Sequence, residues 1–165
     1  MSYLKDTVVI GTVGAGYAAH LHASGYEKVN KVKVRLKTVC DLNQNLAQEL
    51  KEQYGYENIT ANYNDLLNDP EIDVVDIITP PFTHCDLAIK ALRAGKHVIV
   101  EKPLTGYFGK KGEQNVGLTT KRSVMYEEVL RSMDELKDEV ERSGKKFMYA
   151  ENHVYACLLY TSPSP

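Results

Sequence analysis

Short apolar runs alternate with amphipathic segments along most of the chain. The first run, Thr7–Val13, is rich in β-branched residues, as in a strand that is buried on both faces. Similar runs predict further strands at Val32–Cys40, Ile59–Ala61, Ile72–Ile78, His97–Val100 and Lys146–Ala150. Intervening segments predict helices at Tyr17–Tyr26, Asn43–Tyr54, Asn64–Asn68, Cys85–Ala94 and Lys121–Ser143. This alternation predicts an α/β fold with a doubly wound, mostly parallel sheet.

The segment after the fifth predicted strand interrupts the alternation. Gly106–Leu118 is rich in glycine, lysine and polar residues, and we expect it to form an exposed, mobile loop. Gly55 and Gly144 stand where two of the helices should end. The last predicted helix has one apolar face, made of Val124, Val129, Leu130, Met133, Leu136 and Val140.

A glycine-rich turn joins the first strand to the first helix. Its sequence, Gly14-Ala15-Gly16-Tyr17-Ala18-Ala19, has the pattern G-x-G-x-x-A. Gly14 permits a tight turn, Gly16 lets a pyrophosphate approach the backbone, and Ala19 lets the helix pack closely on the strand. The first helix amides, from Tyr17 and Ala18 onward, would then point at phosphates. The alternative is a tight strand–helix turn with no ligand.

Asp41 ends the second predicted strand, about 25 residues after Gly16, where a dinucleotide-binding fold places the acid that binds the adenosine ribose. A carboxylate there repels a 2′-phosphate, so together with the glycine turn it favours NAD over NADP as the cofactor. The alternative is that Asp41 only caps the next helix, which begins near Asn43.

Three further segments follow predicted strands and should lie at the same edge of the sheet, because the carboxyl ends of parallel strands bind ligands in such folds. They are Thr79-Pro80-Pro81-Phe82-Thr83-His84, Glu101-Lys102-Pro103 and Glu151-Asn152-His153. We expect cofactor contacts from Thr79, Pro80, Pro81 and the His84 backbone, with the His84 side chain capping the next helix. Asn152 and His153 are expected at the edge of the substrate pocket, whereas His20 and His22 are expected only to pack.

Composition narrows the class of protein. The chain has 165 residues, a net charge of −2 and a pI near 6.2, which predict one domain and no nucleic-acid or anionic-membrane partner. It has no apolar run near the roughly 20 residues of a membrane span and no apolar core of a signal peptide. Its three widely spaced cysteines indicate neither disulfides nor zinc, and no cluster has metal-ligand spacing. We expect a cytoplasmic protein with no bound metal.

With these residues in place, the chain resembles the Gfo/Idh/MocA oxidoreductases, named after glucose–fructose oxidoreductase and inositol dehydrogenase. The resemblance rests on G-A-G-Y-A-A with the downstream His22, V-C-D at Val39–Asp41, T-P-P-F-T-H at Thr79–His84 and A-G-K-H-V-I-V-E-K-P at Ala94–Pro103. It implies a Rossmann fold that binds NAD(P) and transfers a hydride to or from a sugar, cyclic polyol or related alcohol.

The resemblance also implies roles at Glu101-Lys102-Pro103. Lys102 matches the lysine that lies beside the nicotinamide and the reacting hydroxyl, where an ammonium stabilises developing negative charge. Glu101 would hold that lysine or contact the nicotinamide ribose, and Pro103 would shape the turn, with a cis bond as one option. Two alternatives stay open: a hydrolase that oxidises its substrate transiently with bound NAD, and a non-catalytic nucleotide-binding module.

The resemblance further implies a second, substrate-binding domain, which we expect to lie outside this chain. We therefore expect a dinucleotide-binding domain at 1–156 that binds NAD weakly and is inactive alone, while the full-length enzyme acts on a small molecule and forms a homo-oligomer. Cys157–Pro165 resembles a translated sequencing adaptor, and we expect it to be artefactual. The alternative is a native strand followed by a Ser/Pro-rich terminus.

Overall fold

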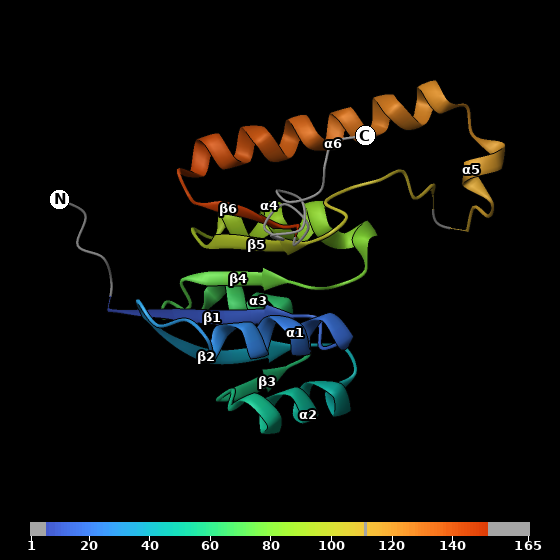
Figure 1. The fold of residues 1–165 in the computed structure, drawn as a ribbon. Coiled ribbons are helices and arrows are strands. Elements are labelled where there is room, and N and C mark those ends of the chain that lie inside the picture. The colour runs from blue at the N-terminus through green and yellow to red at the C-terminus, as the bar shows by residue number, and fades with distance from the viewer. Residues whose placement is uncertain (1–5, 111, 152–165) are drawn as a thin grey trace, which may run out of the picture.

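A computed structural model describes residues 6–110 and 112–151, which form a parallel sheet between two layers of helices (Figure 1). The described part has six strands in the order β3-β2-β1-β4-β5-β6, and every neighbouring pair is parallel. This is the doubly wound Rossmann order, and the predicted fold class is confirmed. The strands are β1 (Thr7–Val13), β2 (Lys33–Cys40), β3 (Asn58–Thr60), β4 (Val74–Ile77), β5 (His97–Glu101) and β6 (Phe147–Ala150).

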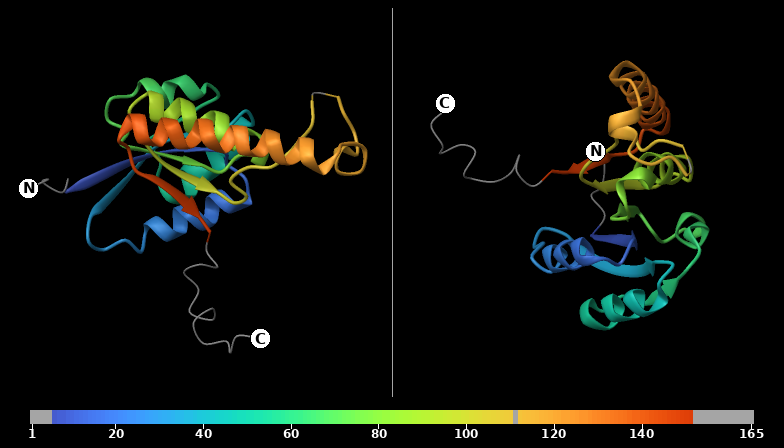
Figure 2. Two further views of the ribbon diagram at one scale, coloured as in Figure 1. Left: turned by 90° about the horizontal axis from the view of Figure 1, so that it is seen from above. Right: turned by 90° about the vertical axis from the view of Figure 1, so that its right-hand side faces the viewer.

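The helices connect these strands and cover both faces of the sheet (Figure 2). They are α1 (Tyr17–Tyr26), α2 (Gln44–Tyr54), α3 (Tyr63–Asn68), the 3-10 turn η1 (Pro81–Thr83), α4 (His84–Arg93), α5 (Val116–Thr119) and α6 (Arg122–Ser143). The core under α1 and α2 is separate from the core under α3, α4 and α6, so these two groups of helices cover opposite faces.

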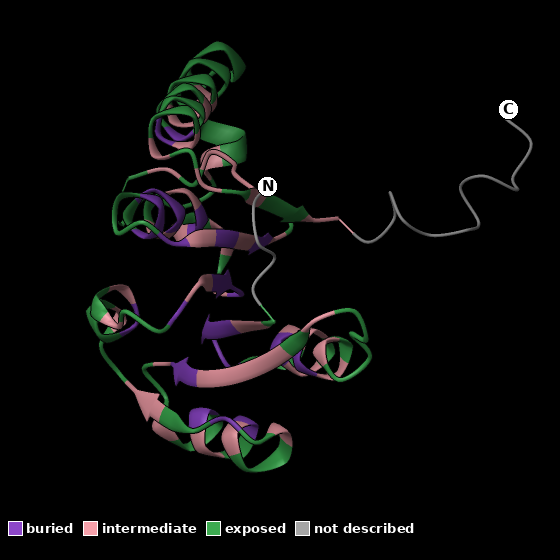
Figure 3. Ribbon diagram, turned by 90° about the vertical axis from the view of Figure 1, so that its left-hand side faces the viewer, coloured by how far each residue is buried: buried purple, intermediate pink, exposed green. Residues whose placement is uncertain are grey.

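The two cores use different residues. Small side chains bring α1 close to the sheet, since Ala15, Ala19 and Ala23 are at most 1% exposed. On the opposite face, larger aliphatic side chains fill the space between the central strands and α4, and Figure 3 shows this buried centre. Close packing of α1 follows from its alanines, because a larger side chain would push the helix away from β1.

Helix ends agree with the sequence expectations. Gly55 and Gly144 adopt positive φ angles, 74° and 62°, at the carboxyl ends of α2 and α6. Asn43 and Asn62 cap the amino ends of α2 and α3, each accepting a hydrogen bond from the backbone N–H two residues later.

The structure corrects one expectation about the region after β5, the loop, and adds to another, the apolar face of the last helix. The expected loop Gly106–Leu118 includes the start of α5, a single helical turn in which the Thr120 N–H donates to the Val116 carbonyl. The apolar face of α6 is buried only in its carboxyl-terminal half, because the other half extends beyond the sheet (Figure 1). Leu136 is 3% exposed, whereas Val124 and Leu130 are both 42% exposed.

Asn152, His153 and Cys157–Pro165 lie outside the described residues, so the expectations about them stay predictions. Among the helices of the described part, none combines the length and the hydrophobicity that crossing a bilayer requires.

Candidate functional site

The strand order changes direction between β1 and β4, and the segments that follow these two strands meet there. Gly14, just after β1, lies against the backbone of Ile78 and Thr79, just after β4. In doubly wound sheets this reversal opens a crevice outside the carboxyl ends of the strands, which is where ligands bind. The structure therefore brings two of the sequence-predicted segments to one place.

Gly14 is required by both conformation and packing. Its φ is +96°, a value that side-chain-bearing residues rarely adopt, and its N–H donates to the Cys40 carbonyl over 2.8 Å. A Cβ atom at this position would lie 2.6 Å from the Ile78 carbonyl oxygen. The tight turn expected from the sequence is thus confirmed, and it joins the ends of β1, β2 and β4.

Gly16 and the residues after it form an open amino end of α1. A Cβ atom at Gly16 would meet no protein atom within 4 Å, and α1 has neither a side-chain cap nor an acidic residue in its first turn. Tyr17 is 81% exposed and Ala18 is partly buried, whereas Ala19 is fully buried as expected. Since the first amides of a helix lack partners within it, this end suits an anion such as a phosphate.

Asp41 lies beside this helix end. Its Oδ2 accepts a hydrogen bond from the Ala15 N–H over 2.7 Å, and its Oδ1 accepts one from the Asn43 N–H over 2.7 Å. The alternative that Asp41 caps α2 is wrong, because Asn43 is the capping residue. Each carboxylate oxygen can accept a further hydrogen bond, so the side chain can hold the glycine loop and still receive a ribose hydroxyl.

The segment after β4 is a turn that is closed by hydrogen bonds. The Thr79 and Thr83 hydroxyls are 2.6 Å apart, and the Thr83 N–H donates to the Pro80 carbonyl. Pro81 begins η1, a short 3-10 turn that the sequence analysis did not predict. Thr79 and Pro81 are partly exposed and Pro80 is exposed, so all three are accessible at the crevice.

His84 does not cap α4, because Thr83 holds the N-cap position and makes no side-chain cap bond. The His84 imidazole is instead 1% exposed and lies between two carbonyl oxygens. Its Nε2 is 2.7 Å from the Thr79 oxygen and its Nδ1 is 2.9 Å from the Pro103 oxygen. The expected role of the side chain is therefore corrected: it connects the turn after β4 to the turn after β5.

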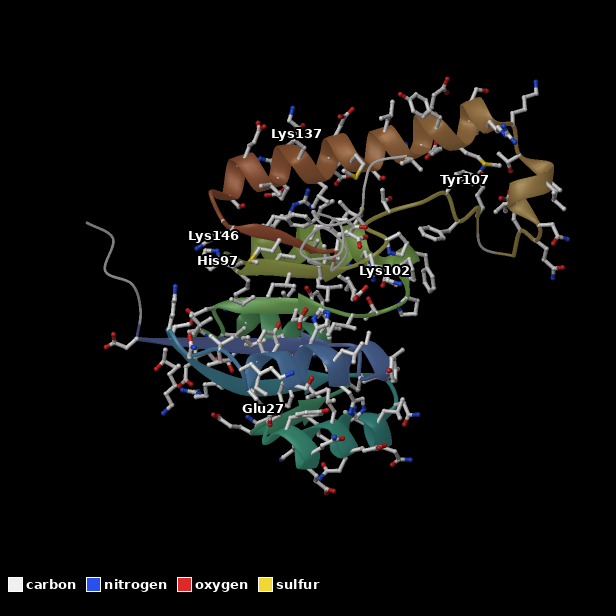
Figure 4. The ribbon with its side chains drawn as sticks, viewed as in Figure 1. Glu27, His97, Lys102, Tyr107, Lys137 and Lys146 are labelled. Atoms are coloured by element: carbon white, nitrogen blue, oxygen red, sulfur yellow. The ribbon has the colours of Figure 1, made fainter. Side chains whose placement is uncertain are left out.

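Glu101, Lys102 and Pro103 form that second turn, and the Lys102–Pro103 bond is cis, as the resemblance allowed. The Lys102 side chain is exposed at the carboxyl end of β5, opposite the end that carries His97 and Lys146 (Figure 4). Among residues 6–110 and 112–151, Lys102 Nζ has no hydrogen-bond or ion-pair partner. Glu101 contacts the backbone rather than the ammonium, since its Oε2 accepts the Lys102 N–H.

A buried polar network near this turn was missed by the sequence analysis. Asp76, in the centre of β4, is fully buried and lies 3.0 Å from His22 Nδ1, while the Tyr26 hydroxyl donates to it over 2.7 Å. His22 therefore does more than pack. Two signals pointed to this network: an aspartate inside the apolar run Val74–Ile77, and His22 and Tyr26 four residues apart on one face of α1.

Two other features bear on the kind of site. Within the described part of the chain, no group of three or more His, Cys, Asp or Glu residues is arranged to hold a metal ion. A cavity of about 960 Å³ lies between α4, α6 and the segment 105–113, and among the candidate residues that the structure describes only Pro81 lines it. The chemistry expected of this chain is therefore concentrated at the sheet edge and not in that cavity.

Comparison with known proteins places these features in a family. The model of the Gfo/Idh/MocA family, described as an oxidoreductase family with an NAD-binding Rossmann fold, matches residues 8–128. Levoglucosan dehydrogenase from Pseudarthrobacter phenanthrenivorans is 37% identical over 102 residues, which cover 58% of this chain and 26% of that enzyme. Myo-inositol 2-dehydrogenase from Thermotoga maritima is 31% identical over 96 residues, which cover 58% and 28%.

A solved structure shows the same relation. Levoglucosan dehydrogenase in complex with NADH superimposes with a TM-score of 0.66 at 26% identity, covering 89% of this chain and 35% of that one. The chain thus spans between about a quarter and a third of the length of these relatives. Since the family match includes the glycine loop, Asp41 and Lys102, the chain belongs to the Gfo/Idh/MocA oxidoreductase family, and its matched residues form that family's NAD-binding Rossmann fold.

Proposed function

We propose that this chain binds NAD in preference to NADP and provides Lys102 to a dehydrogenase that acts on a sugar, a cyclic polyol or a related alcohol. The observation that carries the proposal is the uncapped amino end of α1, with Asp41 on one side of it and Lys102 at a nearby strand end. The levoglucosan and inositol dehydrogenases among its relatives support the substrate class.

The residues at the crevice fit a dinucleotide. The open space at Gly16 and the free amides of the first turn of α1 suit the pyrophosphate, and Asp41 suits the adenosine ribose hydroxyls. Thr79, Pro80 and Pro81 would border the cofactor along the end of β4. Glu101 and Lys102 would lie at the nicotinamide end, with Asn152 and His153 at the edge of the substrate pocket.

Bound NAD supplies the hydride acceptor, and the protein's own contribution centres on Lys102. An exposed ammonium with no carboxylate partner among the described residues can donate a hydrogen bond to the substrate oxygen and stabilise the negative charge that develops there. We further propose a reducing, cytoplasmic environment, because Cys40 and Cys85, the cysteines in the described residues, are free thiols. For the complete protein we propose a homo-oligomer.

Calorimetric titration of the chain with NAD and NADP tests the cofactor preference. Wild-type protein should bind NAD more tightly, because a 2′-phosphate would meet the Asp41 carboxylate. Asp41→Ser should weaken NAD binding by roughly 1.5–3 kcal/mol and reduce the preference. Asp41→Asn is the matched variant, since it retains one oxygen for the Ala15 N–H but removes the charge. An NAD-to-NADP ratio that stays the same in both variants would contradict the ribose role.

The role of Lys102 needs a protein that carries a complete substrate domain. Lys102→Ala should lower kcat for NADH formation by several orders of magnitude and leave NAD affinity nearly unchanged. Lys146→Ala is the control, because Lys146 lies at the opposite end of the sheet (Figure 4). Equal kcat values for Lys102→Ala and the control would contradict a catalytic role.

A further inference from the structure

Asp76 is an unusual residue for the centre of a parallel sheet. It is fully buried in β4, between neighbours that are apolar, and a lone carboxylate there would be strongly destabilising. Both of its oxygens are used. Oδ1 and Oδ2 lie 3.1 and 3.0 Å from His22 Nδ1, and Oδ2 also accepts the Tyr26 hydroxyl over 2.7 Å. Asp76 thus fixes the position of the His22 ring.

The other side of the His22 ring faces the turn that carries Lys102. His22 Nε2 lies 3.6 Å from Glu101 Oε1, and Glu101 Oε2 accepts the Lys102 backbone N–H. The side chains of His22 and Glu101 are 15% and 19% exposed, so water screens this contact only partly. A continuous path of contacts therefore runs from Asp76 through His22 and Glu101 to the Lys102 backbone.

The protonation state of His22 decides whether its contact with Glu101 is attractive or repulsive. Nδ1 must carry a proton to donate to Asp76, because a carboxylate only accepts hydrogen bonds. If the ring is neutral, Nε2 then presents a lone pair to the Glu101 carboxylate; if it is charged, Nε2 presents an N–H. Burial lowers the pKa of His22, but the hydrogen bond and charge of Asp76 and the charge of Glu101 outweigh burial and raise it above 6.5.

We propose that His22 is a positioning residue for Lys102: its charged ring, fixed by Asp76, holds Glu101, which in turn holds the Lys102 amide. Loss of the His22 proton releases Glu101 and lets the Lys102 turn move. The titratable groups that face this assembly are Asp76 on β4, Glu101 on β5 and Tyr26 on α1 itself. The inference extends the proposed function, because it matters for catalysis only if Lys102 is catalytic.

His20 provides an internal comparison. It is on the same helix, but its ring packs edge-on against Tyr54 of α2, with the ring centres 5.7 Å apart. It makes no hydrogen bond or ion pair to a carboxylate among the described residues. A histidine that only packs on α1 is therefore available as a matched control.

Nuclear magnetic resonance of the chain without NAD tests the proposal. The His22 ring should titrate with a midpoint above 6.5, and the Lys102 amide shift should change with the same midpoint. In His22→Gln this change in the Lys102 amide should be lost, while in His20→Gln it should stay. In Glu101→Gln, a substitution on a partly exposed side chain, the His22 midpoint should fall toward 6.5 and the Lys102 change should again be lost.

The proposal is overturned if the wild-type Lys102 amide does not follow the His22 midpoint, or if it still does in Glu101→Gln. Neither measurement depends on whether His22→Gln folds. Both measurements are made without cofactor. A failure to bind NAD would therefore contradict the proposed function but would not affect the measured coupling between His22 and Lys102.

Discussion

The charged groups at the two ends of the parallel sheet differ in whether they have partners within the protein. At the amino end, around the loop that leads into β4, Lys37 Nζ lies 2.8 Å from both Asp69 and Glu71, and Arg35 pairs with Glu57 and Glu71. At the carboxyl end, Lys102 Nζ has no partner among the described residues and the amino end of α1 has no side-chain cap. Protein carboxylates thus neutralise Lys37 and Arg35 near the amino end, while Lys102 and the first amides of α1 at the carboxyl end are available to a ligand.

A buried cation sharpens this contrast. Lys96, 6% exposed just before β5, donates from Nζ to the Asp69 and Ile72 carbonyl oxygens. Burial lowers its pKa, although the Asp69 charge acts in the opposite direction. Two lysines that flank the same strand therefore have different roles. Lys96 bonds to the backbone of the loop before β4, and Lys102 is exposed where ligands bind in this fold.

The largest effect is expected from removing the buried carboxylate near the carboxyl end. Asp76→Ala leaves His22 and Tyr26 without their acceptor in a closed environment, so it should lower the free energy of unfolding by about 3–5 kcal/mol. Urea denaturation measures this loss. Asp86→Ala is the control, because the Asp86 side chain forms an exposed ion pair with Lys90 and no other hydrogen bond within the described part of the chain. Similar losses in both variants would show that Asp76 is no more important than a surface acid.

Substitutions at the two glycines of the loop should have different effects. The Gly14 variant should mainly lose stability, and the Gly16 variant should mainly lose affinity for NAD. Gly14→Ala forces a positive φ on alanine and places Cβ against Ile78, so it should cost at least about 1–3 kcal/mol of unfolding free energy. Gly16→Ala should cost less, about 0.5–1 kcal/mol, because Gly16 has an ordinary φ and open space around it, and the cost comes only from alanine being a poorer N-cap than glycine. It should nevertheless weaken NAD binding in a calorimetric titration. Equal stability losses would contradict this division.

The stability contributed at the two ends of the sheet should also be lost in opposite directions of pH. The pKa of His22 is raised, so its contribution to stability is complete below about 6.5 and is lost as pH rises through the raised value. Burial raises the pKa of Asp69, but hydrogen bonds from Lys37 and from the Glu71 backbone, together with nearby lysine charges, outweigh burial and lower it below 3.8. Its contribution is complete above that value and is lost as pH falls through the lowered one.

The free energy of unfolding, measured from acid to alkaline pH, should fall at both extremes. His22→Gln should remove much of the decline on the alkaline side, and Lys37→Met should reduce the one on the acid side. If His22→Gln left the alkaline side unchanged, the raised His22 pKa would not be coupled to folding.

The smallest effect is expected from Glu71→Gln at the amino end. The pKa of Glu71 is lowered by hydrogen bonds from Lys37 and Arg35, but its side chain is 55% exposed. Exposed ion pairs contribute little and are screened by salt, so the melting temperature should barely change. Asp69 remains available to Lys37 as a compensating partner. A loss as large as that of Asp76→Ala would remove the distinction between the two ends.

The sequence by itself determined the order of the six strands and of the helices other than η1 and α5, the glycine turn, and the positions of Asp41 and Lys102 after strands. These features follow from local rules, because periodicity, glycine and strand ends are read over a few neighbouring residues. The same rules indicated that these residues share one edge, since the carboxyl ends of parallel strands lie together.

Only the tertiary structure decided which of those residues contact one another. His22 and Asp76 are 54 positions apart, and they meet because the strand order places β4 next to β1, beneath α1. Asn43 caps α2, which begins at Gln44, whereas the Asp41 carboxylate accepts a hydrogen bond from the Ala15 N–H of the segment that follows β1. Local patterns mark Asp76 and His22 as unusual residues, but which distant segments meet depends on strand order and helix placement, which are properties of the whole fold.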